Sequence, residues 1–163
     1  MTVSVVWARQ PIPAGPSVFL AGPTPRSAAV ASWRPQAIQA LDAAWTAPAT
    51  LHILVPEHPG GLSDTEYEDQ IEWEWDGLDR ASAILFWIPR DLRTLPGFTT
   101  NIEFGFTVRS GRTVLGCPLD CPNPERNRYL VRLGRRFGIP VTETLAATVA
   151  AALEIVSMVD ITR

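Results

Sequence analysis

The sequence predicts an α/β fold, in which helices cover both faces of a parallel sheet. Short apolar runs typical of buried strands alternate along the chain with longer segments of helical periodicity. Four of the five apolar runs are followed directly by Pro or Gly, residues that end strands and favour turns. A length of 163 residues and a hydrophobic content of 46% suit a globular core, so we expect a single domain over residues 1–163.

Each expected strand is one of these apolar runs, and the expected helices lie between or after them. The strands are predicted at 18–21, 51–55, 83–88, 113–117 and 139–141, and the helices at 30–45, 66–81, 100–110, 125–136 and 143–158. This order favours a flavodoxin-like three-layer sandwich with a five-stranded parallel sheet. In such a fold the ligand crevice lies outside the carboxyl ends of the first and third strands.

Composition argues against several classes of partner. A net charge of −3 offers no basic surface for polymeric DNA or RNA. No run approaches the roughly 20 apolar residues of a membrane span, and the N-terminus lacks a signal-peptide pattern, so we expect a cytoplasmic protein. Cys117 and Cys121 stand in a chain with two histidines. A zinc site would need further ligands at matching spacing, so we expect reduced thiols and no metal.

The helix expected over 66–81 has an apolar and an acidic stripe. The predicted core stripe is Tyr67, Ile71, Trp75 and Leu78, and the acidic stripe is Glu72, Asp76 and Asp79, most simply a solvated face. Gly77 costs a helix interior about 1 kcal/mol relative to Ala, which suggests a requirement other than helix stability. Trp73 and Trp75 cannot both enter one core, so we expect one tryptophan to line a pocket and stack on a nucleobase.

The stretch PGFTTNIEFGF, residues 96–106, gives Glu103 two compatible roles. Thr100 to Glu103 fits a capping box, in which the two side chains satisfy backbone N–H groups at the helix start. A glutamate at the third position of a helix is also expected to stay ionised, as the nucleophile of glycosyl transfer must be. Such a carboxylate attacks the anomeric carbon, forms a glycosyl ester and passes the sugar to an acceptor or to water.

Six segments form an ordered set: FLAGPTPR, SWRPQAIQAL, VPEHPGG, YEDQIEWEWDGLDRASAILFWIP, PGFTTNIEFGF and NRYL. Together they resemble the nucleoside 2-deoxyribosyltransferase-like family, over about residues 17–157. The resemblance implies a flavodoxin-like fold, cleavage of the N-glycosidic bond of a 2′-deoxynucleoside, and transfer of the sugar to another base without a cofactor. It also implies a homo-oligomer, a dimer or larger, because family members commonly complete one another's active sites.

The resemblance assigns roles to individual residues. The family motif Thr-x-x-Glu-x-Gly stands here as Thr100, Glu103 and Gly105, which makes Glu103 the expected nucleophile. The family aspartate that precedes this motif is absent, so protonation of the leaving base is expected to fall to Asp76, with Asp79 as second choice. The substrate-binding residues are expected to be Gly22, Pro23 and Thr24 at the sugar, Trp73 or Trp87 at the base, and Arg26, Asp79, Thr100 and Tyr129 around them.

Three alternatives remain open. Arg26 resembles the arginine with which nucleotide N-glycosidases of the same fold hold a 5′-phosphate, so the chain is alternatively a hydrolase of nucleoside 5′-monophosphates. The missing aspartate is compatible with a nucleotide-binding module without turnover. A flavin-binding electron carrier rests on fold analogy alone. In the first two cases, as for the transferase, the expected partners are a nucleoside or nucleotide and a free nucleobase.

Overall fold

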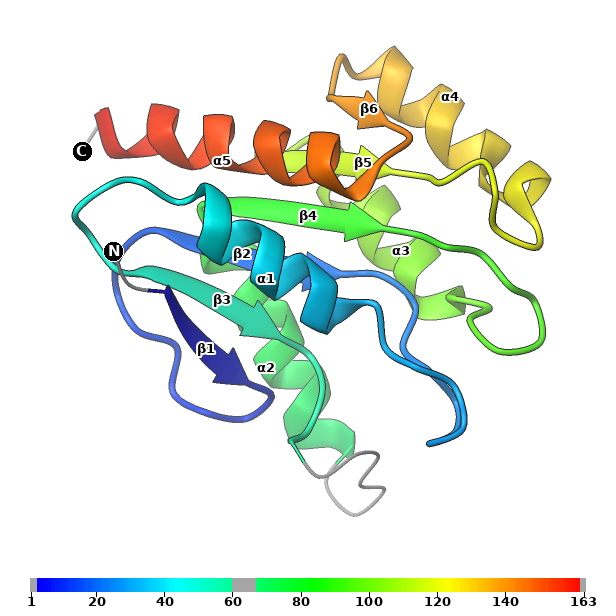
Figure 1. The fold of residues 1–163 in the computed structure, drawn as a ribbon, viewed down its shortest axis with the longest axis horizontal. Coiled ribbons are helices and arrows are strands. Elements are labelled where there is room, and N and C mark those ends of the chain that lie inside the picture. Colours follow the sequence, from blue (N-terminus) through cyan, green and yellow to red (C-terminus); the bar gives the residue numbers. More distant parts are fainter. Residues whose placement is uncertain (1–2, 60–66, 162–163) are drawn as a thin grey trace.

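The computed structural model describes residues 3–59 and 67–161, which form an α/β fold on one parallel sheet (Figure 1). Within these residues the six strands are β1 (Val3–Trp7), β2 (Ser17–Ala21), β3 (Leu51–Val55), β4 (Ala83–Trp87), β5 (Thr113–Gly116) and β6 (Val141–Thr142). They are ordered β1-β3-β2-β4-β5-β6, and every neighbouring pair is parallel. The predicted α/β class is therefore confirmed.

The predicted number of strands was wrong, because β1 adds a sixth. It runs along β3 at the edge of the sheet, from the Val3–Leu51 pair to the Trp7–Val55 pair. Ser4 interrupts its apolar run and the strand pairs with one neighbour only, so its local pattern was weak. The other five strands have the order of the flavodoxin-like fold, and the predicted layering holds.

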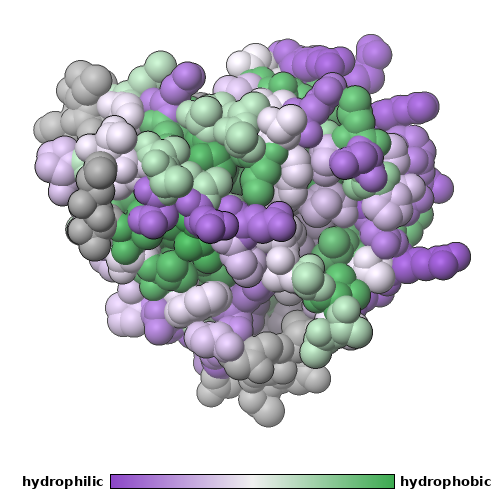
Figure 2. Space-filling model, in the orientation of Figure 1, coloured by the Kyte–Doolittle hydropathy of each residue, from purple (hydrophilic) through white to green (hydrophobic). Residues whose placement is uncertain are grey.

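Five helices and one 3₁₀ turn are present in the described part of the chain. They are α1 (Arg34–Ala44), α2 (Tyr67–Arg80), α3 (Phe98–Thr107), α4 (Arg128–Arg136) and α5 (Leu145–Ile161), with η2 (Pro124–Asn127) before α4. Figure 1 shows α1 and α5 on one face of the sheet, and the two core clusters confirm that α2, α3 and α4 pack on the other. Figure 2 shows the first face, where hydrophobic residues gather over α5 and hydrophilic residues lie where α4 is.

The predicted core stripe of α2 was wrong at Tyr67 and Trp75 and right at Leu78. Tyr67 is 66% exposed and Trp75 is 55% exposed, whereas Trp73, Gly77 and Leu78 are buried. The ring of Trp73 packs on Phe19 of β2, with ring centroids 6.0 Å apart. A Cβ atom on Gly77 would lie 2.8 Å from the same Phe19 ring. The helix thus turns its glycine toward the sheet, since only glycine allows so close an approach.

The remaining expectations concern metals, thiols and membranes. Cys117 is buried, Cys121 is half-buried, and both are free thiols. Across residues 3–59 and 67–161, no three His, Cys, Asp or Glu side chains are grouped to hold a metal ion. No helix in the same ranges has the length and apolar character needed to span a bilayer.

Candidate functional site

A cavity of about 700 Å³ lies outside the carboxyl ends of β2 and β3 and against the start of α3. Its walls come from residues 22–28, Ser32, Arg34, residues 56–58, Tyr67, Gln70, Glu74, residues 96–100 and Glu103. From β2 the chain leads to β3 on one side and then crosses to β4 on the other, so the topological switch point lies between β2 and β4, and residues that follow both strands line the cavity. Its volume is within the range of small-molecule sites.

The loop after β2 forms one wall of the cavity. Gly22 has a φ of +148°, and a Cβ atom there would lie 2.3 Å from the backbone oxygen of Trp87. Glycine is therefore required where this loop passes over the end of β4. The indole Nε1 of Trp33 donates to the carbonyl of Pro23 over 3.1 Å and so holds Pro23, the residue after Gly22, in place.

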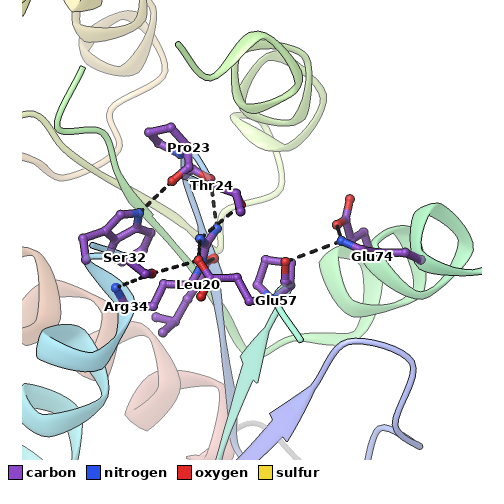
Figure 3. Close-up of polar contacts among 11 residues, drawn as sticks. Leu20, Pro23, Thr24, Ser32, Arg34, Glu57 and Glu74 are labelled. Carbon is purple, nitrogen blue, oxygen red and sulfur yellow. Dashed lines mark hydrogen bonds and ion pairs between the residues drawn. The ribbon is translucent and has the colours of Figure 1, made fainter. Parts of the chain in front are cut away.

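Arg34 lies at the base of this wall, 1% exposed, and its guanidinium joins the ends of two strands (Figure 3). Its Nε donates to the carbonyl of Leu20 over 3.1 Å and its Nη2 to the carbonyl of Gly22 over 2.9 Å. Its Nη1 lies 3.2 Å from Thr24 Oγ1 and 2.5 Å from Glu57 Oε1. The loop after β2 and the end of β3 are thus fixed by one buried cation.

The start of α3 forms the opposite wall, as predicted for the helix after the third expected strand. The helix begins at Phe98 after Gly97, which has a φ of +61° and no side-chain cap. Arg90 fixes the turn before the helix by donating to the carbonyls of Pro96 and Gly97 and to Asn101 Oδ1, the last over 2.7 Å. The capping-box prediction was therefore wrong, because Glu103 is the sixth helical residue rather than the third.

Two carboxyl groups, Glu103 of α3 and Glu74 of α2, line the same cavity. The pKa of Glu103 is raised to about 7, first by burial and then by the charge of Glu74, against the opposing charge of Arg34. Burial also raises the pKa of Glu74, against a hydrogen bond from Gln70 Nε2 over 2.9 Å and the charge of Arg34. Two buried carboxyls that repel each other do not both ionise readily, so the pair retains a proton near neutral pH.

Several predicted site residues line the cavity. They are Gly22, Pro23, Thr24, Arg26, Thr100 and Glu103. Arg26 lies at the rim, where its Cζ is 5.7 Å from the centroid of the exposed Phe98 ring. The other five predicted residues are not among the lining residues; they are Trp73, Asp76, Asp79, Trp87 and Tyr129.

The two predicted aspartates lie on another side of α2. Asp76 is half-exposed and forms an ion pair with Arg80 over 2.8 Å, one helical turn away. Asp79 is exposed as well. Two residues along a helix turn through about 200°, so Asp76 cannot face the cavity that Glu74 lines. Glu74 supplies the second carboxyl of the site instead.

None of the three predicted aromatic residues lines the cavity. Trp73 is buried against the sheet and its Nε1 donates to the carbonyl of Gln10 over 2.7 Å. Trp87 packs under Gly116, where an added Cβ would lie 2.5 Å from its ring. Tyr129, on α4, is 76% exposed. The aromatic residues that do line the cavity are Tyr67 and Phe98.

The sequence reasoning missed Arg34, Glu57 and Glu74, and for Glu74 a signal existed. Gln70, Trp73 and Gly77 have the spacing of one helical face, and Glu74 lies one turn after Gln70 on that face. The glycine and the tryptophan that were unexpected in a solvated helix thus mark its inward side. Arg34 and Glu57 carried no comparable local signal, because they meet only through the fold.

The fold and the cavity define an α/β protein with a cavity of small-molecule size at the switch point of its sheet, lined by the carboxyls of Glu57, Glu74 and Glu103. The family model described as nucleoside 2-deoxyribosyltransferase like matches residues 15–121, a range that includes every lining residue of the cavity. The chain belongs to this family. No curated protein matches the chain.

Proposed function

We propose that this protein cleaves the N-glycosidic bond of a 2′-deoxynucleoside and transfers the sugar to another nucleobase, with Glu103 as the nucleophile. The observation that supports this most is the pair of half-buried carboxyls with raised pKa values, Glu74 and Glu103, in one cavity. Glu103 stands in the segment TTNIEFG, which lies within the range matched by the family model. Glu74 and Glu103 share a proton near neutral pH, and the reactive form of the pair is the one in which Glu103 is ionised and Glu74 holds the proton.

In the first half-reaction, a carboxylate oxygen of Glu103 attacks the anomeric carbon of the sugar. The bond from this carbon to the base breaks, its electron pair leaves with the base, and Glu74 gives its proton to the base nitrogen. The products are a glycosyl ester on Glu103, a free base and an ionised Glu74. This assignment replaces Asp76 with Glu74 as the general acid, because Glu74 lines the cavity and Asp76 does not.

In the second half-reaction, a nitrogen of another base attacks the same carbon. The ester bond breaks, Glu103 leaves as a carboxylate, and Glu74 accepts the proton that the incoming base loses. Water in place of the base gives hydrolysis by the same route. No step of this reaction needs a cofactor.

The lining residues suggest how the substrate is oriented. The backbone of Gly22 and Pro23 and the hydroxyl of Thr24 suit the sugar, next to the carboxyls that act on it. Tyr67 and Phe98 are aromatic and line the cavity, so we assign them the contact with the base in place of Trp73 and Trp87. Thr100 is buried beside the start of α3 and supports that wall.

Hydrolysis of a nucleoside 5′-monophosphate is the alternative that one observation favours. Arg26 lines the cavity at its exposed rim, where a guanidinium can pair with a phosphate. A chromatographic assay with nucleosides and their 5′-monophosphates, each with and without a free base, separates the two reactions. A new nucleoside that forms only with added base supports transfer, and a free sugar phosphate supports the alternative. Absence of any product from the whole panel would contradict both.

Variants of the two carboxyls test their roles. Glu103→Gln is expected to lower turnover by about 10³-fold or more on every substrate, because it removes the nucleophile. Glu74→Gln is expected to lower it by about 10²-fold to 10⁴-fold on ordinary nucleosides. A 2′-deoxyriboside with a nitrophenolate leaving group needs no proton, so its cleavage should largely survive Glu74→Gln. Equal losses on both substrates would contradict the role of Glu74.

The control for these variants is Asp76→Asn, which removes a carboxylate of α2 that lies outside the cavity. Its turnover is expected to stay within about twofold of the original, since an exposed ion pair contributes little to structure. Intact-mass measurement with nucleoside alone should reveal a sugar adduct on the peptide that contains Glu103. An adduct on the peptide that contains Glu74 would make Glu74 the nucleophile and Glu103 the general acid.

We also propose that the chain assembles with copies of itself and acts in the cytoplasm. The support for assembly is an apolar stripe on α3, formed by Phe98, Ile102 and Phe106, which are 67%, 73% and 69% exposed. Residues at this spacing lie on one side of a helix. An exposed stripe of large apolar side chains is typical of an interaction surface. The cytoplasmic location rests on the sequence pattern alone.

A further inference from the structure

We propose that Arg34 is a positioning residue, a role that rests on the function proposed above. From the base of the cavity it holds the loop after β2 and the end of β3 in place, and it supplies the positive charge that keeps one carboxyl of the Glu74–Glu103 pair ionised. Arg34 thereby acts on the reaction through other residues rather than through contact with the reacting atoms.

The geometry supports the holding role. Arg34 is 1% exposed, and its guanidinium donates to two carbonyls of the β2 end, to Thr24 Oγ1 and to Glu57 Oε1. Ser32 Oγ donates to the same Glu57 oxygen over 2.8 Å and accepts from the backbone N–H of Arg34 over 3.2 Å. Lysine cannot reproduce this arrangement, because it lacks the planar fork of donors. The loop that contains Gly22 and Thr24 therefore depends on an arginine in α1.

The charges that face the cavity support the electrostatic role. The charged and titratable lining residues are Arg26, Arg34, Glu57, His58, Tyr67, Glu74 and Glu103. Of the two arginines in this set, Arg26 is exposed at the rim, where water and salt screen its charge. Arg34 is buried, so its charge acts on the carboxyls with little screening.

The carboxyl pair responds to this buried charge. Arg34 lowers the pKa of both Glu74 and Glu103, against the effect of burial, which raises both. Burial lowers the pKa of Arg34 itself, while the charges of Glu57, Glu103 and Glu74 raise it. Glu57 pairs directly with the guanidinium and so offsets part of its charge. Without Arg34, both carboxyls of the pair would stay protonated over a wider pH range, and the nucleophile would form only at a higher pH.

The test measures carboxyl titration directly and needs no turnover. Protein labelled with ¹³C at the glutamate side-chain carboxyl is titrated by NMR, with Glu74→Gln and Glu103→Gln used to assign the two signals. The main comparison is Glu57→Gln against the double variant Arg34→Gln/Glu57→Gln. Both lack the Glu57 charge, so they differ in the charge of residue 34 without leaving a buried carboxylate unpaired.

The double variant is expected to titrate the pair at a pH higher by about one unit, the lower end of the shift that a nearby opposite charge causes, because it lacks the charge that lowers both pKa values. Equal values in the two variants would overturn the electrostatic role. If the double variant does not fold, the titration of Glu57→Gln is compared with that of the original protein, and this comparison tests the electrostatic role. Its pair should titrate at lower pH, because the Arg34 charge is no longer offset, and an unchanged value would overturn the proposal.

Arg34→Lys separates the two parts of the role. It keeps the positive charge and loses the fork, so the pKa of the pair should change by less than in the double variant while thermal stability falls. Where the protein turns over a nucleoside, the acidic limb of the pH–rate profile should move with the NMR values. NMR shifts in a protein without turnover would leave the role of Arg34 intact and refute the proposed function. Turnover without NMR shifts would refute the role of Arg34 and leave the proposed function intact.

Discussion

At the scale of single residues, the ionised form of Glu103 is unfavourable in the folded protein. Glu103 has an ordinary pKa of 4.5, and burial beside the charge of Glu74 raises this pKa to about 7 in the folded protein. A group with a raised pKa stabilises the fold in its protonated form. Its contribution is fully present below pH 4.5 and is lost as the pH rises through about 7. The raised pKa that the proposed reaction uses thus makes the folded chain less stable at alkaline pH.

Glu103→Gln should remove this dependence, since the amide does not ionise. We expect the free energy of unfolding of the variant to exceed that of the original at pH 8 by roughly 1–3 kcal/mol, from about 1.4 kcal/mol per pKa unit and partial relaxation. At pH 5 the two proteins should be nearly equal. Urea unfolding at both values measures this, with Glu154→Gln on the exposed side of α5 as the control. A difference that does not grow with pH would contradict the buried charge of Glu103.

At the scale of elements, the orientation of α2 decides which acidic residue enters the site. Gly77 allows the helix to approach the ring of Phe19, and this approach turns Glu74 toward the cavity. The apolar residues Tyr67 and Trp75 remain exposed as a consequence. A glycine in a helix is therefore tolerated at a cost of about 1 kcal/mol because closer packing offsets it.

Gly77→Ala tests this orientation, with Gly105→Ala as the matched control. Alanine at 77 places its Cβ 2.8 Å from the Phe19 ring, so we expect a loss of about 1–3 kcal/mol from overpacking despite the better helix propensity. Nothing lies within 4 Å of a Cβ at 105, so the same change there should stabilise α3 by about 0.5–1 kcal/mol. Thermal unfolding of both variants measures the difference. A gain at both positions would show that the packing of α2 is loose.

At the scale of the whole molecule, the stripe of Phe98, Ile102 and Phe106 lies beside the entrance of the cavity, and Phe98 belongs to both. An aromatic side chain offers about 150–250 Å², so the stripe supplies roughly 300–400 Å² of the ~800 Å² that each partner buries in a stable dimer. Arg109, three residues after Phe106, has its guanidinium carbon 4.7 Å from the centroid of the Phe137 ring, a contact within its own chain. The three stripe residues are uncharged, so two copies of the stripe can meet without repulsion.

We expect light scattering to find a dimer or a larger assembly at tens of micromolar, a rough working concentration for micromolar or tighter affinity. Ile102→Asp should produce the monomer, because it places a charge in the centre of the stripe. Ala150→Asp, at an exposed position of α5 on the other face of the sheet, should leave the assembly unchanged. A monomer in the original protein, or an assembly lost only in the α5 variant, would exclude the α3 stripe as the assembly surface.

The sequence predicted the class, the layering and the order of five of the six strands, because buried strands and helices have periodicities that can be read without tertiary contacts. It also located Glu103 and the loop after β2, since both are marked by turn residues and by a motif. It failed for the edge strand β1, where a single neighbour leaves a weak pattern.

Only the tertiary structure decided the remainder of the site. The rotation of α2 depends on the contact of Gly77 with Phe19, two residues of different elements. This rotation places Glu74, and not Asp76, in the cavity wall. Arg34 and Glu57 meet across two strand ends, and the start of α3 is set by Arg90 instead of by its own Thr100. The raised pKa of Glu103 follows from burial and from a charge on another helix. These properties depend on distances between segments remote in the chain, which local spacing does not encode.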